Sequence, residues 1–304
     1  MKDIIKKIFS ALFVFAGICL LFYPWSSNYV NSHQAENEVK SYTETVEKNA
    51  DKEEQERLYK EAVEYNKTLP DNQIHLTEPF EASLVNTEPY VYENLLSVNG
   101  MDTMGSIKIP DINVNLPIMH GTSDAVLQKA VGHLKGSSLP VGGKDTHCVL
   151  TGHTGLSNMK LFTDLTELKK GDVFILTTLG HKLAYKVIDI YVVTPNDVDK
   201  LKIIEGLDLC TLVTCTPYGI NSHRLLVRAE RTKYVPEDEK VPFTNPIRSQ
   251  WMRSYLIAVL IGLGIALLLI ILHRIFIITK RKKEKNKNNS VSVDHKNNKK
   301  GEKV

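Results

Sequence analysis

The sequence predicts a mainly β domain that is flanked by two membrane helices and preceded by a helical extension. Three observations lead to this fold class. Two long apolar runs lie near the two ends of the 304-residue chain. A polar, charge-dense segment follows the first of them, and a region rich in β-branched and aromatic residues fills most of the remainder.

The two apolar runs have the length and composition of membrane spans. Ser254–His273 is a run of twenty residues without a formal charge, and a helix of that length crosses the hydrocarbon core of a bilayer. Ile8–Trp25 follows three lysines, Lys2, Lys6 and Lys7. No good small-x-small cleavage site comes after it, which favours a retained anchor over a cleaved signal peptide.

Basic residues flank both spans and set the expected topology. Lysines precede the first span, and Lys280–Lys283 follows the second. The positive-inside rule then places both termini in the cytoplasm and residues 26 to about 250 outside the cell, in a two-pass plasma-membrane protein. The basic tail is explained by this membrane flank, so we expect no nucleic acid partner.

Two segments of different texture precede the β-rich region. Residues 26–69 are predicted to form one or two amphipathic helices, because Leu58, Ala62 and Tyr65 recur at helical spacing. Residues 70–92 contain three prolines and no convincing apolar period, which predicts an extended loop.

Short apolar and alternating runs from Met104 onward predict strands punctuated by Gly, Pro and Asn. A hairpin is expected around Leu179–Gly180–His181. Short helices are expected in SDAVLQKAVGH, capped by Ser123, and in NMKLFTDLTELKKGD, closed at Gly171. Seven or so strands in about 130 residues indicate a closed barrel or a sandwich. The strand runs are GSIKIP, LPIMHG, THCVLTGH, DVFILTTL, KLAYKVIDIYVVTP, LDLCTLVTC and HRLLVRAER.

A thiol and a guanidinium stand at the facing ends of two of these strands. Cys215 ends the run TLVTC, and Arg224 opens the run HRLLVR nine residues later, after a turn with Pro217 and Gly219. A nearby base or cation makes a cysteine nucleophilic, and an arginine can stabilise an oxyanion. The ordinary alternatives are a small buried cysteine and a surface arginine.

The base must come from the eight histidines of the outer region. His153 ends the strand run CVLTGH, where its side chain can reach a strand mouth. His133, in VGHLKG, is the rival, and spacing alone does not choose between His153 and the others. Three cysteines lie outside the first span, and this odd, sparse set is no disulfide framework.

Several motifs together resemble the sortases, which are membrane-anchored cysteine transpeptidases of Gram-positive bacteria. The resemblance covers roughly Leu58 to Tyr234 and is closest to the pilin-polymerising class C, because of the helical extension, the proline-aromatic loop and the second span. It implies a closed barrel of about eight strands. The motifs are TLVTCTPYGINSHRLLVR, LTGHTGL, KLFTDL, MGSIKIP, LPIMHGTS, AVGHLKGSSLPVGG and YENLLSVNG.

The resemblance also implies a reaction. Cys215 attacks the Thr–Gly carbonyl of an LPXTG-like sorting signal, His153 protonates the leaving fragment, and Arg224 stabilises the developing charge. A lysine amine of the next pilin subunit then resolves the thioester. No organic cofactor and no obligatory metal are implied; the partners are pilin subunits with a sorting signal and an acceptor lysine, and we expect a monomeric catalytic domain.

A lid over the cysteine is implied as well, formed in class C sortases by an Asp-Pro-aromatic motif. This chain offers two tetrads, TEPF at Thr77–Phe80 and TEPY at Thr87–Tyr90. The spacing to the flanking motifs favours the first. The lid residues are therefore expected to be Glu78, Pro79 and Phe80, with glutamate in place of the family's aspartate.

The two other cysteines of the outer region each lie five residues before a candidate catalytic residue. Cys148 precedes His153 by five residues, and Cys210 precedes Cys215 by five. In the sortase barrel the two strands concerned are parallel neighbours, so we expect these two thiols to lie level, buried and free.

Other functions remain open at this point. A housekeeping sortase, a hydrolytic cysteine peptidase and a non-enzymatic β-barrel receptor are the alternatives. VPFTN at Val241–Asn245 only loosely resembles a sorting signal. The expected boundaries are cytoplasmic 1–7, anchor 8–25, helical extension 26–69, lid loop and linker 70–92, catalytic barrel 93–235, linker 236–253, second span 254–278 and cytoplasmic tail 279–304.

Overall fold

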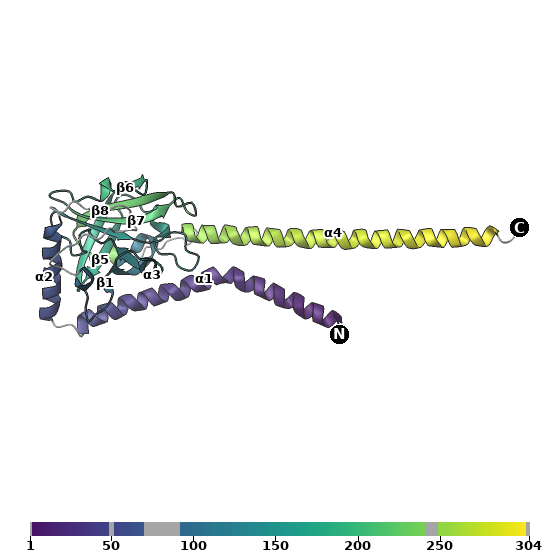
Figure 1. Cartoon of the computed structure of the whole chain (residues 1–304), viewed down its shortest axis with the longest axis horizontal. Coiled ribbons are helices and arrows are strands. Elements are labelled where there is room, and N and C mark those ends of the chain that lie inside the picture. The colour runs from purple at the N-terminus through teal and green to yellow at the C-terminus, as the bar shows by residue number, and fades with distance from the viewer. Residues whose placement is uncertain (1, 49–51, 70–91, 241–248, 302–304) are drawn as a thin grey trace. The chain divides into compact units, whose positions relative to one another are not determined.

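The computed structural model of the chain describes residues 2–48, 52–69, 92–240 and 249–301 (Figure 1). The chain forms two compact units, Met1–Arg253 and Ser254–Val304, and the second is helical. The expected lid residues 78–80 and the motif at 241–245 fall outside the described residues.

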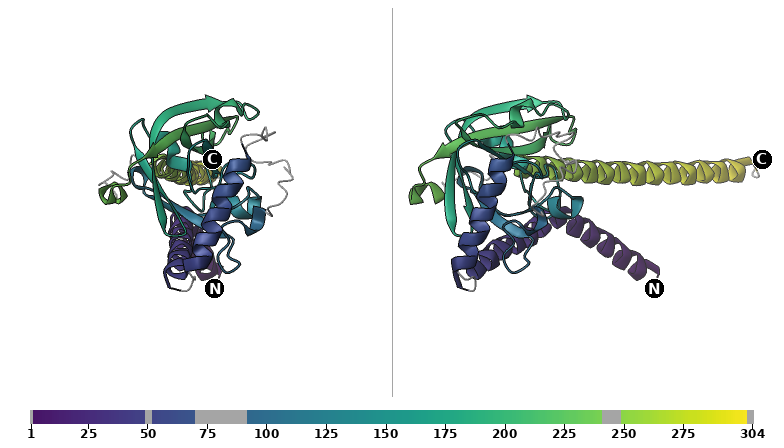
Figure 2. Two further views of the ribbon diagram at one scale, coloured as in Figure 1. Left: turned by 90° about the vertical axis from the view of Figure 1, so that its left-hand side faces the viewer. Right: turned by 60° about the vertical axis from the view of Figure 1, so that its left-hand side comes forward.

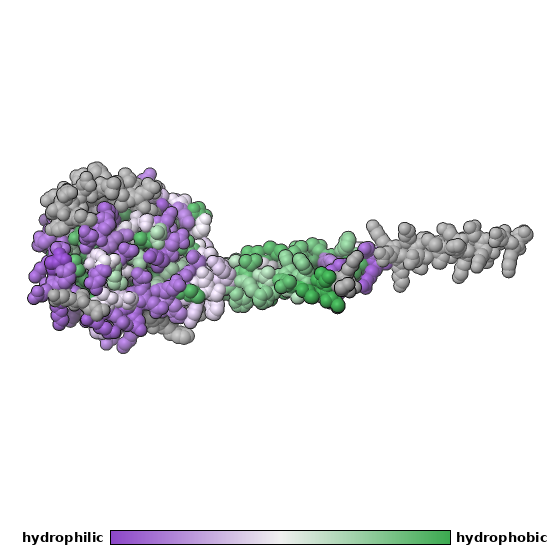
Figure 3. All heavy atoms as spheres, turned by 60° about the horizontal axis from the view of Figure 1, so that its bottom comes forward, coloured by the Kyte–Doolittle hydropathy of each residue, from purple (hydrophilic) through white to green (hydrophobic). Residues whose placement is uncertain are grey.

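Both expected spans lie in long helices. Helix α1 runs from Lys2 to Lys48 and α4 from Gln250 to Gly301. Their portions Ile4–Lys48 and Gln250–Arg281 are long and apolar enough to cross a membrane, and Figure 3 shows apolar residues gathered on the helical part of the molecule. Both helices are therefore compatible with membrane anchoring, as expected.

The helical extension packs on the β domain through a few buried side chains. It comprises the outer part of α1 and helix α2, Lys52–Thr68, whose Leu58, Ala62 and Tyr65 are buried as their spacing predicted. Tyr42 of α1 donates a hydrogen bond to the carbonyl of Met104 at 3.0 Å. This contact fastens α1 to a strand of the domain.

Eight strands close into a barrel in the order β1-β2-β3-β4-β7-β8-β6-β5, which confirms the expected barrel (Figure 2). The pairs β2–β3 and β4–β7 are parallel, and the other six pairs are antiparallel. The strands are β1 Thr103–Ile109, β2 Val114–His120, β3 Val131–His133, β4 Thr146–Thr151, β5 Val173–Thr178, β6 His181–Val193, β7 Asp208–Thr216 and β8 His223–Thr232.

The structure confirms the predicted hairpin but shortens the two predicted helices. The β5–β6 hairpin is confirmed: Thr178 pairs with His181, and Leu179 and Gly180 both have the positive φ of a two-residue turn. The first expected short helix is only α3, Asp124–Leu127, and the second is a 3-10 turn at Thr163–Glu167.

Strand β3 is the element that the sequence prediction missed. Its three residues were placed at the end of a helix, yet they pair with β2 on one side and β4 on the other. Such a short strand is held by its partners more than by its own propensity.

Strands β4, β7 and β8 are apolar on both faces, and this positions the site. Leu150, Leu212 and Val227 point into the main core of the barrel. The alternate residues of the three strands form the outer face, where Val149, Val213 and Leu226 build a second cluster with Leu134 and Leu201. Because side chains alternate along a strand, every second residue from this cluster outward remains on the outer face.

Candidate active site

Cys215 and Arg224 are direct cross-strand partners at one end of β7 and β8. Cys215 lies two residues beyond Val213, and Arg224 two residues before Leu226, so both side chains lie on the outer face. Directly opposed residues of an antiparallel pair have Cβ atoms about 4.5–5.5 Å apart. The expectation that the turn brings thiol and guanidinium together is confirmed.

His153 reaches the same place along the parallel strand β4. Thr151 pairs with Val213, and beyond it the amide of Gly152 donates to the Val213 carbonyl at 3.1 Å. The Thr214 hydroxyl also donates to the Gly152 carbonyl at 2.7 Å. His153 follows Gly152 directly, so it lies just beyond β4 at the same end of the barrel as Cys215.

The backbone next to His153 passes closely over a buried aromatic ring. A Cβ atom on Gly152 would lie 2.9 Å from ring atoms of Phe162, so only glycine fits there without a shift. The Phe162 amide returns to donate to the His153 carbonyl at 3.1 Å. The ring of Phe162 thus supports the turn that carries His153.

The rival His133 is fully buried and held in a hydrogen-bonded network. One ring nitrogen lies 2.9 Å from the Tyr92 hydroxyl, and the other 2.9 Å from the Ser138 carbonyl oxygen. His147 is similarly buried, with its nitrogens at the Lys202 carbonyl and the Thr211 hydroxyl. Both histidines are explained as structural residues, and His153 remains a candidate base at this end of the barrel.

Cys215 and His153 are the two titrating groups of the site, and for each of them burial and a nearby charge shift the pKa in opposite directions. Partial burial raises the pKa of the Cys215 thiol, and the nearby Arg224 cation lowers it. Burial lowers the pKa of His153, while the carboxylate of Asp124 raises it. Both burial effects favour the uncharged thiol and imidazole, so Arg224 is the group that favours the reactive thiolate.

Asp124 is a residue that the sequence prediction did not connect with the site. It was expected only at the start of a short helix, where the structure has it in the first turn of α3. The parallel crossover from β2 to β3 brings it within electrostatic range of His153. No motif in the sequence marks that crossover, because β3 is too short to predict.

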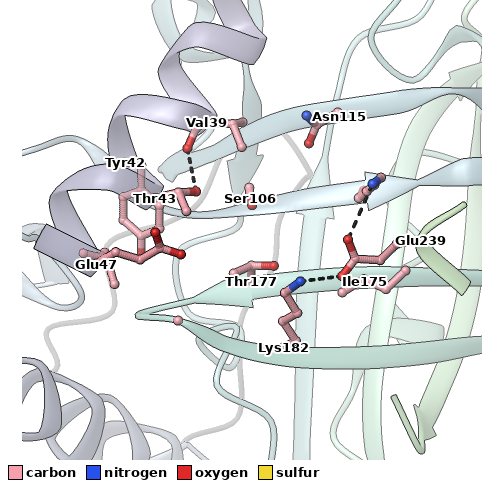
Figure 4. Close-up of a pocket in the computed structure, with 13 residues that line it drawn as sticks. Val39, Tyr42, Thr43, Glu47, Ser106, Asn115, Ile175, Thr177, Lys182 and Glu239 are labelled. Atoms are coloured by element: carbon pink, nitrogen blue, oxygen red, sulfur yellow. Dashed lines mark hydrogen bonds and ion pairs between the residues drawn. The ribbon is translucent and has the colours of Figure 1, made fainter. Parts of the chain in front are cut away.

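A cavity of about 270 Å³ lies between α1 and strands β1, β5 and β6 (Figure 4). Its lining mixes polar and apolar side chains, and Glu239 bridges Lys182 at 2.6 Å and Lys108 at 3.5 Å. None of Cys215, His153 and Arg224 lines it. Within the described residues no group of three or more His, Cys, Asp or Glu side chains could hold a metal ion.

Cys148 and Cys210 are paired level on the parallel strands β4 and β7, as expected. Both are buried free thiols, and they point into the main core, on the opposite face from Cys215. Burial holds the pKa of Cys210 well above its usual range, which keeps it unreactive.

Because both sulfur atoms are free and buried, protein purified from its native membrane should carry both thiols reduced. Alkylation under denaturing conditions without a reductant is expected to modify all four cysteines, as intact mass would show. A species that accepts two labels and gains two more only after reduction would reveal a Cys148–Cys210 bridge and contradict this expectation.

The fold and site together define a class: a mixed β-barrel with a thiol, an imidazole and a guanidinium at one end of β4, β7 and β8. A model of the sortase domain family matches residues 107–232. Sortase A of Bacillus anthracis is 30% identical over 162 residues, which cover 53% of this chain and 74% of that protein. The chain belongs to the sortase family, whose members are cysteine transpeptidases.

Solved structures narrow the likeness to class C. Sortase C-1 from Actinomyces oris is 47% identical, with a TM-score of 0.55, over 60% of this chain and 99% of that one. Sortase C1 from Streptococcus agalactiae is 40% identical, with a TM-score of 0.60, over 66% and 100%. By contrast, the match to Sortase A of Streptococcus agalactiae, 33% identical, spans 46% of this chain and only 59% of that protein.

Proposed function

We propose that this chain is a pilin-polymerising transpeptidase whose catalytic residues are Cys215, His153 and Arg224. The observation that carries the proposal is the pairing of Cys215 and Arg224 as cross-strand partners, and it is supported by His153, which lies two residues beyond the end of the neighbouring strand β4. The likeness to solved class C sortases and the two candidate membrane helices support the pilin-polymerising class.

In the first half-reaction the Cys215 thiolate attacks the Thr–Gly carbonyl carbon of an LPXTG-like signal. The carbonyl oxygen becomes an oxyanion, which Arg224 stabilises as a charged donor. His153 gives a proton to the departing glycine amine, the C–N bond breaks, and a thioester remains on Cys215.

In the second half-reaction a lysine amine of a pilin subunit attacks the thioester. His153 takes a proton from the attacking amine, and Cys215 leaves as the thiolate. The product is an isopeptide bond between two subunits. The Arg224 guanidinium is held at the strand end by Nη1, which donates to the carbonyls of Asn221 at 3.2 Å and His223 at 3.3 Å.

The proposal includes a two-pass topology with the boundaries expected from the sequence. The barrel, residues 93–235, would lie outside the cell, and both termini in the cytoplasm, as the basic flanks of the two apolar helices indicate. Such a topology places the thiol on the side of the membrane where exported pilins arrive.

The test is incubation of the protein with a pilin that carries a sorting signal, followed by mass spectrometry. We expect a thioacyl adduct on Cys215 that is resolved by a pilin lysine faster than by water. Release by water alone would identify a hydrolytic peptidase, and preference for a cell-wall amine would identify a housekeeping sortase. No adduct with any sorting signal would sink the proposal.

A lid formed by Glu78, Pro79 and Phe80 remains a prediction, since these residues lie outside the described part of the chain. Glutamate has one more rotatable bond than aspartate, and an ion pair at a partly open site is worth about 1 kcal/mol or less. Phe80 packing should then hold the lid at least as firmly as pairing of Glu78 with Arg224.

Phe80→Ala is therefore expected to speed modification of Cys215 by a bulky thiol reagent, because the ring no longer covers the sulfur. Tyr90→Ala, in the second tetrad, is the matched control and should leave the rate unchanged. The opposite pattern would assign the lid to the second tetrad, and two unchanged rates would mean that neither ring shields the thiol.

A further inference from the structure

The first turn of α4 packs on the segment that follows His153. Trp251 is buried, with only 5% of its surface exposed. Its indole Nε1–H donates to the Leu156 carbonyl at 3.2 Å, and its backbone amide donates to an Asp164 carboxylate oxygen at 3.3 Å. One residue of the second membrane helix thus binds both arms of the loop between β4 and β5.

Neighbouring residues of the same turn strengthen this attachment. The Thr166 hydroxyl donates to the Gln250 side-chain oxygen at 2.6 Å, and Arg253 pairs with Glu167 at 2.7 Å. All these groups belong to the compact unit that ends at Arg253. The start of α4 is therefore part of the barrel unit and not of the second unit.

The attached segment is itself joined to His153. The Phe162 amide donates to the His153 carbonyl at 3.1 Å, and the Gly155 amide donates to the Thr163 hydroxyl at 3.1 Å. These bonds fold the chain after His153 into a tight loop. A displacement of residues 156–167 would therefore be passed to the histidine.

Helix α1 holds the same loop at a different point. The Asn31 side chain donates to the Asn158 carbonyl at 2.9 Å, and the Lys160 amide donates to the Asn28 side-chain oxygen at 2.9 Å. Asn28 lies about one helical turn beyond Trp25, the last residue of the expected first span. The loop after His153 is thus bound to the outer end of each anchor helix.

The chain has two tryptophans, Trp25 and Trp251, and their exposure differs. Each stands beside an apolar run, where tryptophan commonly marks the membrane interface. Trp25 is 51% exposed, as an interface residue would be, whereas Trp251 is 5% exposed and bonded to Leu156. Trp251 therefore needs another explanation.

We propose that Trp251 is a positioning residue, through which the first turn of α4 fixes the loop that carries His153. The inference rests on the proposed function for its catalytic consequence, since it assumes that His153 serves Cys215. It makes the first turn of α4 part of the active-site scaffold, so that the geometry of the site depends on more than the barrel strands.

Trp251 matters for catalysis because the reaction tolerates little displacement of His153. His153 stands one residue beyond Gly152, the last residue bonded to β7, on a turn. A misplacement of a catalytic group by about 1 Å can cost about a hundredfold in rate. Loss of the indole removes both its packing and its bond to Leu156, so the effect should fall on kcat for acylation and spare KM.

The test compares Trp251→Ala with Trp25→Ala in the full chain reconstituted in lipid nanodiscs. We expect Trp251→Ala to lower kcat for thioacyl formation by about tenfold or more, with KM unchanged and faster amide exchange in residues 154–167. Trp25→Ala should change neither. Arg253→Glu should loosen the same loop, and adding Glu167→Arg should restore it.

Amide exchange needs no substrate, so it tests the attachment even if the proposed function fails. Quenching by brominated lipids adds a second independent measurement. In Trp25→Phe the fluorescence of Trp251 should resist quenching, and in Trp251→Phe that of Trp25 should not. Strong quenching of Trp251, or exchange in residues 154–167 no faster in Trp251→Ala than in Trp25→Ala, would overturn the inference.

Discussion

Cys215→Ala is expected to abolish thioacyl formation and all transfer to an amine. The thiolate supplies the bond that stores the acyl group between the two half-reactions, and alanine offers no nucleophile in its place. Intact mass after incubation with a sorting signal would show no adduct. Because the side chain is small and only partly buried, the variant should fold normally.

The chain provides its own matched controls for this experiment. Cys148→Ala removes a thiol from β4 and Cys210→Ala removes one from β7, the strand of Cys215. Both of these thiols lie on the inner face of the barrel. Both variants should lower stability slightly, through lost packing, and leave adduct formation in place. Turnover by Cys215→Ala, or loss of the adduct in an otherwise folded Cys148→Ala, would contradict the assignment of the nucleophile.

Arg224→Ala and His153→Ala are each expected to slow acylation by about a hundredfold or more, the usual cost of losing a transition-state donor. The arginine change has a second, distinctive effect. Burial already raises the pKa of Cys215, and Arg224 opposes it. Without the cation the pKa rises further, so the pH profile of Cys215 alkylation should move to higher pH.

Arg228→Ala is the matched control on the same strand and the same face, two pleats from Arg224. Arg228 pairs with Asp189 at 2.6 Å and does not oppose Cys215. Its loss should affect stability while leaving the alkylation profile in place. Equal shifts for the two variants, or near-normal turnover in Arg224→Ala, would remove Arg224 from the mechanism.

Much of this site could be predicted from the sequence because its parts depend on local patterns. The apolar runs on either side of the Pro217–Gly219 turn indicate two neighbouring strands, and the spacing can bring Cys215 and Arg224 together, as their cross-strand pairing shows. The apolar periodicity of residues 58–65 likewise predicts a helix with a buried face.

The rest depends on contacts between distant segments. Whether His153 or His133 lies beside the thiol follows from the parallel pairing of β4 with β7, across more than fifty residues of sequence. Asp124 comes within electrostatic range of His153 through a crossover that ends in a three-residue strand. Trp251 lies in what the sequence indicates only as a linker, and its burial is visible only once the loop at 156–167 is placed.

Helix α1 has a consequence for how substrates are met. It is one helix from Lys2 to Lys48 with Pro24 inside it, and the twenty-three residues after Trp25 make a helical rod of roughly 35 Å that is bonded to the barrel unit at Asn28, Asn31 and Tyr42. A barrel bonded to such a helix is not attached through a flexible linker. Under the proposed function and topology, the thiol would stay at one height above the lipid, and a membrane-bound sorting signal would reach it by lateral diffusion. Confinement to a plane raises the effective concentration of each reactant for the other without a single additional contact.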